Sequence, residues 1–491
     1  MIQAKLIPFQ NFKSIIKNYY FQVFTPIPLF WLVFYALGFP PPMDDDLFFI
    51  GAAINLAKTG NFVNPLLALW SDRAIDRFYV QPPFHSHILG FWLQLFGVNT
   101  ASLLAFQVFC YFVFSVFLAL LLKRYKFPWF TPLAITLCYG LFMFGFGLRQ
   151  DGISMAFLAL GLWLISYDQY LAYFFGFVCL GSSILSLPVN MVIAIPFGLG
   201  ILIRNFWSIK DAPVTLKKHL FYTSMIWGLA VLFTFFILLL SINFELSRFL
   251  SDLSWCASLR RQPISNLIPS IIWQISIGAG KMIYGSLYGL LLAVEILVLI
   301  NYKKQENLIK GFLVISNISL GTMLIAYSNV LGTNFNFFCW VCVIILLSKS
   351  TLPAISRKIL GLMAAVIVFI NYSPTFLTLF FQDRTVSTSV QEAKEFVEAH
   401  PNTAYWVDSI AARFVFDYDI PEGSVGWEFS SGSVFFLPSS VAQKPPDMVW
   451  IIGTKQAWHI PDELPDYPRL QVFGREFQSI ARKPYDVLII E

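Results

Sequence analysis

The stretch FQVFTPIPLFWLVFYALGFPPPMDDDLFFIGAAINLAKTG, residues 21–60, begins with an apolar run and then places three carboxylates side by side, Asp44, Asp45 and Asp46. The run over 20–40 is long enough to cross about 30 Å of hydrocarbon. Three adjacent carboxylates cannot enter hydrocarbon at a tolerable cost, so they must lie in water or in a polar cavity. The stretch therefore predicts a membrane span followed by an acidic segment at a membrane face.

The whole chain has the composition of an integral membrane protein. Of its 491 residues, 57% are hydrophobic and 52 are Phe, and the mean hydropathy is +0.67, which excludes an ordinary soluble domain. We expect a polytopic α-helical membrane protein with about eleven transmembrane helices. The apolar runs that predict them are 20–40, 101–122, 128–147, 152–167, 171–187, 189–203, 220–241, 282–300, 308–327, 335–348 and 359–380. Pro188 and Pro196 are expected to bend their segments, and the first run is expected to remain as a signal anchor.

Lys and Arg are divided unevenly between the two sets of loops. The segments 5–17, 123–126, 204–218, 303–310 and 349–358 hold sixteen of them, whereas the longer loops on the opposite side hold eight. Short cytoplasmic segments are enriched in Lys and Arg, so the first set is expected to be cytoplasmic. This predicts a multi-pass protein of the plasma (inner) membrane, with the N-terminus inside and the aspartates outside. The net charge of +5 then requires no nucleic-acid partner.

The composition changes after residue 380. Residues 381–491 contain no long apolar run, and they hold sixteen of the 28 acidic residues. Their pattern predicts a short amphipathic helix over 389–400 and buried strands over 404–407, 448–452 and 487–490. We therefore expect a transmembrane domain, 1–380, followed by a small extracytoplasmic α/β domain, 381–491.

The first outer loop, 41–100, contains two segments that are too short to cross a membrane. Residues 46–58 are mostly apolar and stop at Gly60, and residues 84–96 follow Pro82-Pro83. Both are predicted to be helices that lie in the membrane interface. The aspartates would occupy the N-cap and first turn of the first helix, where the helix dipole favours anions. Helix capping explains one aspartate well and three poorly.

Three groups of residues in and after this loop have a familiar order and spacing. They are Asp45-Asp46 with Phe49, Ala53, Gly60-Asn61-Phe62 and Pro65; Gln81-Pro82-Pro83-Phe84 with Leu95-Phe96-Gly97; and Arg149-Gln150-Asp151. In this order they resemble the acidic-pair loop, the basic-Pro-Pro segment and the Arg-x-Asp element of the membrane-embedded C-class (GT-C) glycosyltransferases. The resemblance is greatest to bacterial members akin to protein mannosyltransferases and the lipid A aminoarabinose transferase. It is confined to residues 45–151; elsewhere the topology alone supports it.

The resemblance implies an enzyme that moves a hexosyl or pentosyl group from a polyprenyl-phosphate donor to an acceptor outside the cytoplasm. Residues 1–380 would be the catalytic domain, and the acceptor would be an envelope lipid, a glycan or a protein. Asp45 would be the general base, and Asp46 would orient it or hold a cation. The candidate ligands of the donor phosphate are Gln81, Arg149, Arg260 and Arg261. The candidates for further contacts with the substrate are Asp151, His85 and Tyr79.

Two departures from the family pattern affect these assignments. The acidic pair is Asp-Asp rather than the commoner Asp-Glu, which shortens the reach of the second carboxylate by one methylene. Position 81 is Gln where relatives usually have Lys or His. Phosphate binding must then depend on Arg73, Arg77, Arg149 or the pair Arg260-Arg261.

Each candidate also has a plainer structural explanation. Arg149 can pair with Asp151 at a helix end, Arg260-Arg261 can lie in a solvated loop, and His85 can be the polar tip of an interfacial helix. His85 and His87 point in different directions on a helix, so they cannot share a metal. A divalent cation, Mg²⁺ or Mn²⁺, at Asp45 and Asp46 is left open, and no other cofactor is expected.

The alternative function is that of a polytopic transporter or lipid flippase. Transporters place charged residues near the midplane of the membrane, often within a repeated architecture. In this chain Glu295 is the acid well inside an apolar run, and no internal repeat is visible. The transferase accounts for the aspartates and the Pro-Pro segment, which the transporter leaves unexplained.

The predicted orientation can be tested with one cysteine in the tail, which has none of its own. In a chain whose outer-loop Cys256 has been replaced, we expect Ser440→Cys to react with a membrane-impermeant maleimide in intact cells. Reaction only after the cytoplasmic face is opened would place the tail, and with it the aspartates, inside.

Overall fold

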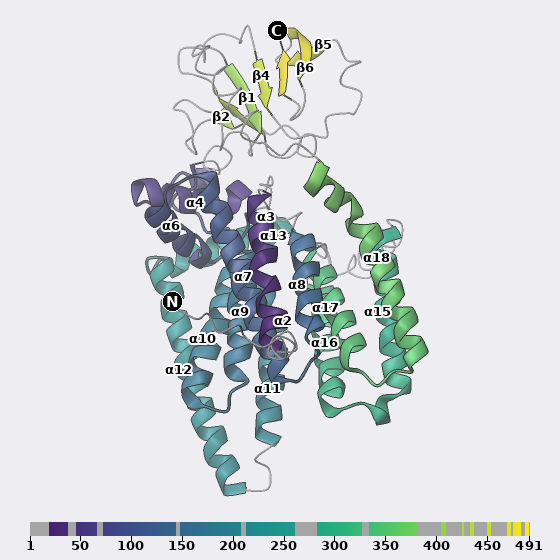
Figure 1. Ribbon diagram of the computed structural model, residues 1–491. Coiled ribbons are helices and arrows are strands. Elements are labelled where there is room, and N and C mark those ends of the chain that lie inside the picture. Colours follow the sequence, from purple (N-terminus) through teal and green to yellow (C-terminus); the bar gives the residue numbers. More distant parts are fainter. Residues whose placement is uncertain are drawn as a thin grey trace, which may run out of the picture.

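In the computed structural model the chain forms a bundle of helices, followed by a β-sheet beyond one end of the bundle (Figure 1). The structure describes residues 19–37, 46–65, 72–143, 148–207, 213–260, 282–326 and 333–381, together with seven strands between residues 404 and 490.

Helices lie at each position where an apolar run predicts one. They are α2 (Tyr19–Phe24) with α3 (Pro26–Ala36), α7 (Thr100–Arg124), α8 (Phe130–Met143), α9 (Asp151–Ile165), α10 (Tyr170–Ser186), α11 (Met191–Trp207), α12 (Pro213–Ser241), α15 (Met282–Ile300), α16 (Asn307–Ala326), α17 (Thr333–Lys349) and α18 (Ala354–Phe381). Pro188 starts the short 3-10 turn η2 (Pro188–Asn190) between α10 and α11, whereas α11 continues through Pro196. A proline lacks the N–H that an uninterrupted helix would need at position 188.

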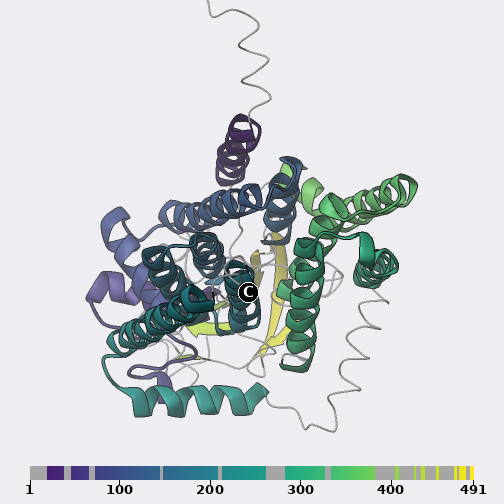
Figure 2. The ribbon, with the colours of Figure 1, turned by 90° about the horizontal axis from the view of Figure 1, so that it is seen from below.

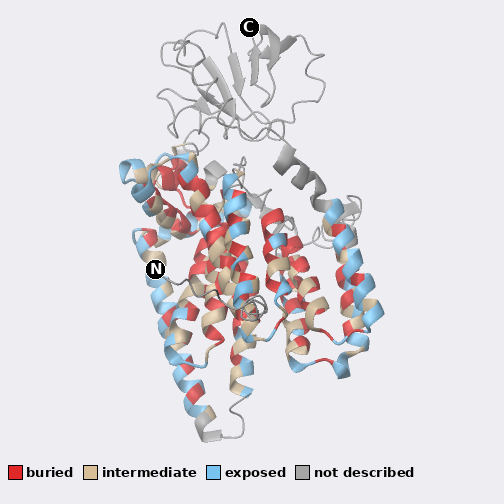
Figure 3. Ribbon diagram, viewed as in Figure 1, coloured by how far each residue is buried: buried red, intermediate tan, exposed pale blue. Residues whose placement is uncertain are grey.

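The chain is a polytopic helical membrane protein. Among the described residues, four helical segments are long and apolar enough to cross a membrane unaided: Thr100–Arg124, Pro188–Trp207, Leu216–Ser241 and Asn307–Ile325. The shorter apolar helices include α9 and α10, so the number of eleven crossings stays a prediction. Much of α12 and α18 is exposed, and these helices lie at the edges of the bundle (Figure 3).

Two helices of the first loop agree with the sequence. α4 (Asp46–Thr59) and α6 (Phe84–Phe96) are the two short helices predicted over 46–58 and 84–96. Each is followed by a glycine with positive φ, Gly60 at +77° and Gly97 at +85°, a conformation that ends a helix at little cost only for glycine. The two helices pack closely, since a Cβ added at Gly90 would lie 2.9 Å from Leu56 Cδ2. The loop also contains the 3-10 turn η1 (Asp72–Ala74).

A further helix, α13 (Leu246–Arg260), was missed by the search for apolar runs. Its sequence alternates polar and apolar residues and holds no long apolar run, but Leu246, Phe249 and Leu253 recur with the period of one helix face. α12 begins at Pro213, seven residues before the apolar run that predicted it. The run starts later because the first turns of the helix carry Lys217, Lys218 and other residues that are not apolar.

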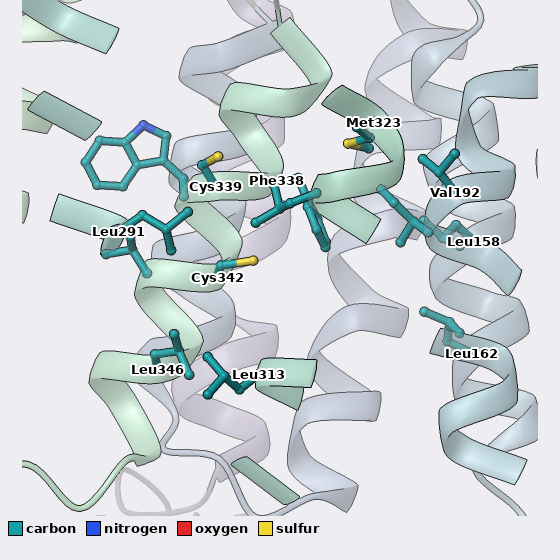
Figure 4. Close-up of a cluster of buried hydrophobic side chains, with 14 of the residues drawn as sticks. Leu158, Leu162, Val192, Leu291, Leu313, Met323, Phe338, Cys339, Cys342 and Leu346 are labelled. Atoms are coloured by element: carbon teal, nitrogen blue, oxygen red, sulfur yellow. The ribbon is translucent and has the colours of Figure 1, made fainter. Parts of the chain in front are cut away.

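The helices near the site are held together by close packing around α9. A Cβ added at Gly176 of α10 would lie 2.6 Å from Ile165 Cγ1 and 3.1 Å from the carbonyl oxygen of Gly161, so these glycines allow α9 and α10 to touch. A large apolar cluster then joins α9 and α11 to α15, α16 and α17, with Leu158 and Phe338 among its members (Figure 4). Viewed along their axes, the green helices of residues 282–381 gather on one side of the blue and teal ones (Figure 2).

The strands form one seven-stranded sheet with the order β2-β3-β1-β4-β7-β6-β5. The strands are β1 (Ala404–Asp408), β2 (Val425–Gly426), β3 (Ser433–Phe436), β4 (Val449–Ile452), β5 (Arg469–Val472), β6 (Arg475–Arg482) and β7 (Val487–Ile490). β1 and β4 are parallel, and the other neighbours are antiparallel. The strands predicted over 404–407, 448–452 and 487–490 are thus β1, β4 and β7. The helix predicted over 389–400 lies outside the described residues.

Candidate active site

The start of α9 carries the Arg-x-Asp element. Gln150 is the N-cap residue and Asp151 is the first helical residue, where the helix dipole stabilises a carboxylate. The side chain of Asp151 is buried, and its Oδ2 lies 3.4 Å from Nε of Arg149. The plainer explanation of Arg149 as an ion-pair partner is therefore correct as far as it goes.

Arg149 also reaches α4. Its guanidinium carbon lies 4.8 Å from the centre of the Phe49 ring, a cation–π contact. α4 begins at Asp46, three residues before Phe49, which is about 4.5 Å along a helix axis. The contact therefore places Arg149 beside the first turn of α4, whose first residue, Asp46, belongs to the acidic pair.

The Pro-Pro segment meets the same place. Nε2 of Gln150 donates a hydrogen bond to Oε1 of Gln81 at 3.0 Å. Because the oxygen of Gln81 is engaged, its amide hydrogens are the groups that can donate to a ligand. Together with the contact between Arg149 and Phe49, this bond joins three segments that are far apart in sequence, 46–49, 81 and 149–151.

A side chain of α7 binds the backbone carbonyl group of Arg149. Nε2 of Gln107 donates to the carbonyl oxygen of Arg149 at 2.7 Å. The approach needs glycine at position 152, since an added Cβ there would lie 2.8 Å from Gln107 Oε1 and 2.7 Å from Tyr111 Cε1. Gln107 was not among the predicted site residues, although an amide within an otherwise apolar run was a signal for it.

The acidic residues themselves are only partly visible. Asp44 and Asp45 lie outside the described residues, and Asp46 is described only as the first residue of α4. The roles of base, orienting group and cation ligand thus stay predictions. Within the described part of the chain, no group of three His, Cys, Asp or Glu side chains could hold a metal ion. Cys339 and Cys342 are free and buried in the apolar cluster.

His85 occupies an unusual position in the first turn of α6. It is 1% exposed, and neither of its ring nitrogens has a hydrogen-bond partner. Its ring lies 6.2 Å from that of Phe106 on α7. Burial lowers the pKa of His85 to about 3, so the ring is neutral at physiological pH. The structure thus places His85 inside the protein and not at a solvated tip.

Tyr79 and His87 attach the loop to the end of α12. The hydroxyl of Tyr79 donates to the carbonyl oxygen of Ile242 at 3.2 Å, and Nε2 of His87 lies 2.7 Å from the carbonyl oxygen of Ser241. Both rings stack on Phe62. Burial raises the pKa of Tyr79 to about 12, so its phenol remains a donor. In this structure the hydroxyl of Tyr79 binds the protein backbone; a contact with substrate stays a prediction.

Asp252 of α13 binds the same loop. Its buried Oδ2 accepts a hydrogen bond from the backbone N–H of Tyr79 at 3.1 Å, and Oδ1 lies 3.9 Å from Arg73 Nη1. Arg73 also covers the Trp255 ring at 5.6 Å. α13 therefore lies along the first loop. Arg260 is its last residue, and Arg261 lies outside the described residues.

Comparisons with known proteins give one similarity. No family model matches the chain, and no curated protein sequence matches it. Among solved structures, the chain is similar to the crystal structure of ArnT from Cupriavidus metallidurans bound to undecaprenyl phosphate, with a TM-score of 0.47 and 13% identity over 95% of this chain and 97% of that one. Such a distant likeness transfers no residue role, so the function of this chain is inferred from its own residues.

The burial of His85 predicts a pH-dependent stability. The unfolded chain protonates this histidine near pH 6.5, whereas the folded chain does so only near pH 3. The unfolded state therefore binds more protons between these values, and the free energy of unfolding should fall as the pH drops, by at most about 1.4 kcal/mol per pH unit. We expect His85→Phe to remove this part of the slope, measured by chemical unfolding in detergent at pH values from about 7 down to about 4. His87 is present in both proteins, so parallel curves would contradict the assignment to His85.

Proposed function

We propose that the protein is a glycosyltransferase that moves a sugar from a polyprenyl-phosphate donor to an acceptor at the extracytoplasmic face. The observation that carries the proposal is the meeting of three motif segments. Arg149 lies on Phe49 in α4, and its neighbour Gln150 binds Gln81 of the Pro-Pro segment. Asp46 opens α4 three residues before Phe49, and the proposal adds the carboxylates of Asp45 and Asp46 to this arginine and this amide donor. Together they are the groups that transfer from a phosphate carrier requires.

The chemistry is a displacement at the anomeric carbon of the donor sugar. Asp45 takes the proton of the acceptor hydroxyl or amine as the acceptor atom bonds to the anomeric carbon. The bond between that carbon and the phosphate oxygen breaks, and polyprenyl phosphate leaves with the electron pair. Arg149 grips the departing phosphate, because a guanidinium can bind two phosphate oxygens. Gln81 adds a neutral donor. Asp46 orients Asp45.

The charge of the phosphate site comes mainly from Arg149. The Arg149 side chain is 25% exposed, so its terminal nitrogens can bind a ligand while Nε lies near the Asp151 carboxylate. Arg77 and Arg73 are engaged elsewhere, since Arg77 pairs with Glu245 and Arg73 lies near Asp252. Arg260 and Arg261 are proposed as further ligands at the end of α13. His85 would offer a neutral ring nitrogen to the donor or the acceptor.

The same proposal extends to the organisation of the chain. Residues 1–380 form the catalytic membrane domain, with the donor's lipid tail in the bilayer beside it. Residues 381–491 form an extracytoplasmic α/β domain that contacts the acceptor. In Figure 1 the sheet lies beyond the end of the bundle that carries α4 and α6, which supports a role on the side of the active site.

The catalytic role of Asp45 can be separated from helix capping by one substitution. Asn is a near-equal helix cap but cannot accept a proton. We expect Asp45→Asn to lower transfer by roughly 10²-fold or more. The measurement is mass spectrometry of lipids from a deletion strain that carries the variant. The polyprenyl-phosphate sugar should accumulate as it does in the deletion strain.

Asp44→Asn is the matched control for that experiment. It removes a neighbouring carboxylate of the same triplet, and it should leave the lipid profile close to that of the wild type. A normal profile for Asp45→Asn, at normal protein levels in the membrane, would remove Asp45 from catalysis.

A further inference from the structure

The corner between α12 and α13 is strained. Asn243 has φ = 49° and Phe244 has φ = 62°, so two consecutive residues with side chains adopt the left-handed conformation. Asn tolerates this region, but a bulky residue such as Phe does so only at a cost in free energy. Such a conformation persists only where surrounding contacts determine it, and it occurs often at functional sites.

The contacts that determine the corner come from the first loop. Arg77 Nη1 binds Glu245 Oε1 at 2.6 Å. With the amide oxygen of Asn243 turned toward it, Arg77 also donates to that oxygen from Nη1 at 3.0 Å and from Nη2 at 3.2 Å. The bonds from Tyr79 to Ile242 and from His87 to Ser241 hold the two preceding carbonyl groups. Three side chains of residues 77–87 thus bind the five-residue corner 241–245.

The loop contacts continue along one face of α13. Phe249 meets the Tyr79 ring at 5.9 Å, Asp252 accepts from Tyr79 N–H, and Trp255 meets Phe78 at 5.6 Å. These positions are three residues apart, as expected for one side of a helix. Position 260 follows 249 by eleven residues, which returns to nearly the same face. The helical period therefore puts position 260 near the face of α13 that meets the loop.

We infer that Arg77 and Glu245 are positioning residues that hold α13 against the loop of the acidic motif and so set where the end of α13 lies in the site. The inference rests on the proposed function, because it assumes that the end of α13 binds the donor phosphate. The ion pair is the charged contact among those that hold the corner in its left-handed conformation. Without it the corner relaxes, and α13 loses its fixed direction while α4, α6 and α9 keep theirs.

The hold on the corner can be measured without any substrate, by hydrogen–deuterium exchange of the purified full-length protein. Arg77→Gln should speed the exchange of amides in 242–256 by roughly tenfold or more, because a charge-assisted bond that limits local opening is lost. Exchange in α16 should not change. The charge swap Arg77→Glu with Glu245→Arg should restore most of the protection. The control is Arg248→Gln, which removes one positive charge of α13, one turn after Glu245. Arg248 forms no ion pair within the described residues, so this change should have little effect on the exchange.

The effect on the site is read from binding of undecaprenyl phosphate by the same proteins. Arg77→Gln should weaken binding several-fold, the charge swap should recover it, and Arg248→Gln should not weaken it. Arg77→Gln combined with Glu245→Gln should weaken binding no more than either alone, since both remove one interaction. Unchanged exchange in 242–256 for Arg77→Gln would overturn the hold on the corner. Faster exchange with unchanged binding would overturn the positioning role.

These outcomes differ from a failure of the proposed function. If the protein is not a transferase, Asp45→Asn will leave the lipids unchanged, whether or not the wild-type protein binds undecaprenyl phosphate. The exchange data would then still report whether the ion pair holds α13, but the positioning role for donor binding would be overturned with the function.

Discussion

The guanidinium group of Arg149 lies between the Phe49 ring and the Asp151 carboxylate, and this placement holds α4 against α9. Gln107 fixes the backbone carbonyl of Arg149 from α7. A charged group so close to apolar helices is tolerated because it is paired and stacked. This side chain therefore fixes the polar part of the contact between α4 and α9, beside the apolar packing of α4 on α6 and α7.

The first loop behaves as part of the folded core because it is bound on two sides. Its helices α4 and α6 pack on each other and on α7, and its extended part lies along α13. The polar groups of this contact are largely satisfied: Asp252 accepts from a backbone N–H, and Tyr79 donates to a backbone carbonyl. Buried polar groups without a hydrogen-bond partner would each lower the free energy of unfolding. His85 and Oε2 of Glu245 are among the exceptions. A buried ring without a partner is a reason to expect a ligand at His85.

Much of the architecture could be predicted from the sequence because the membrane imposes simple rules. Apolar runs located the helices of the bundle, and Gly60 and Pro82-Pro83 marked the boundaries of α4 and α6. α13 was missed because it lies outside the apolar runs and is held by tertiary contacts with Tyr79 and Arg73. The motifs identified Gln81, Arg149 and Asp151, but no local pattern predicts that Gln107 supports Arg149. The hydroxyl of Tyr79 binds the carbonyl oxygen of Ile242, just after the end of α12. The sequence did not predict this bond, because it depends on where α12 ends in space.

In the proposed mechanism Arg149 is the residue at which the donor phosphate and the acidic motif meet. The most direct test is a cryo-electron-microscopy structure of the protein in lipid nanodiscs with undecaprenyl phosphate. We predict phosphate density roughly 3 Å from the guanidinium of Arg149, at the Asp46 end of α4 and within reach of the amide of Gln81. Phosphate bound elsewhere, with Arg149 in contact only with Asp151 and Phe49, would contradict this account and leave Arg149 with a structural role alone.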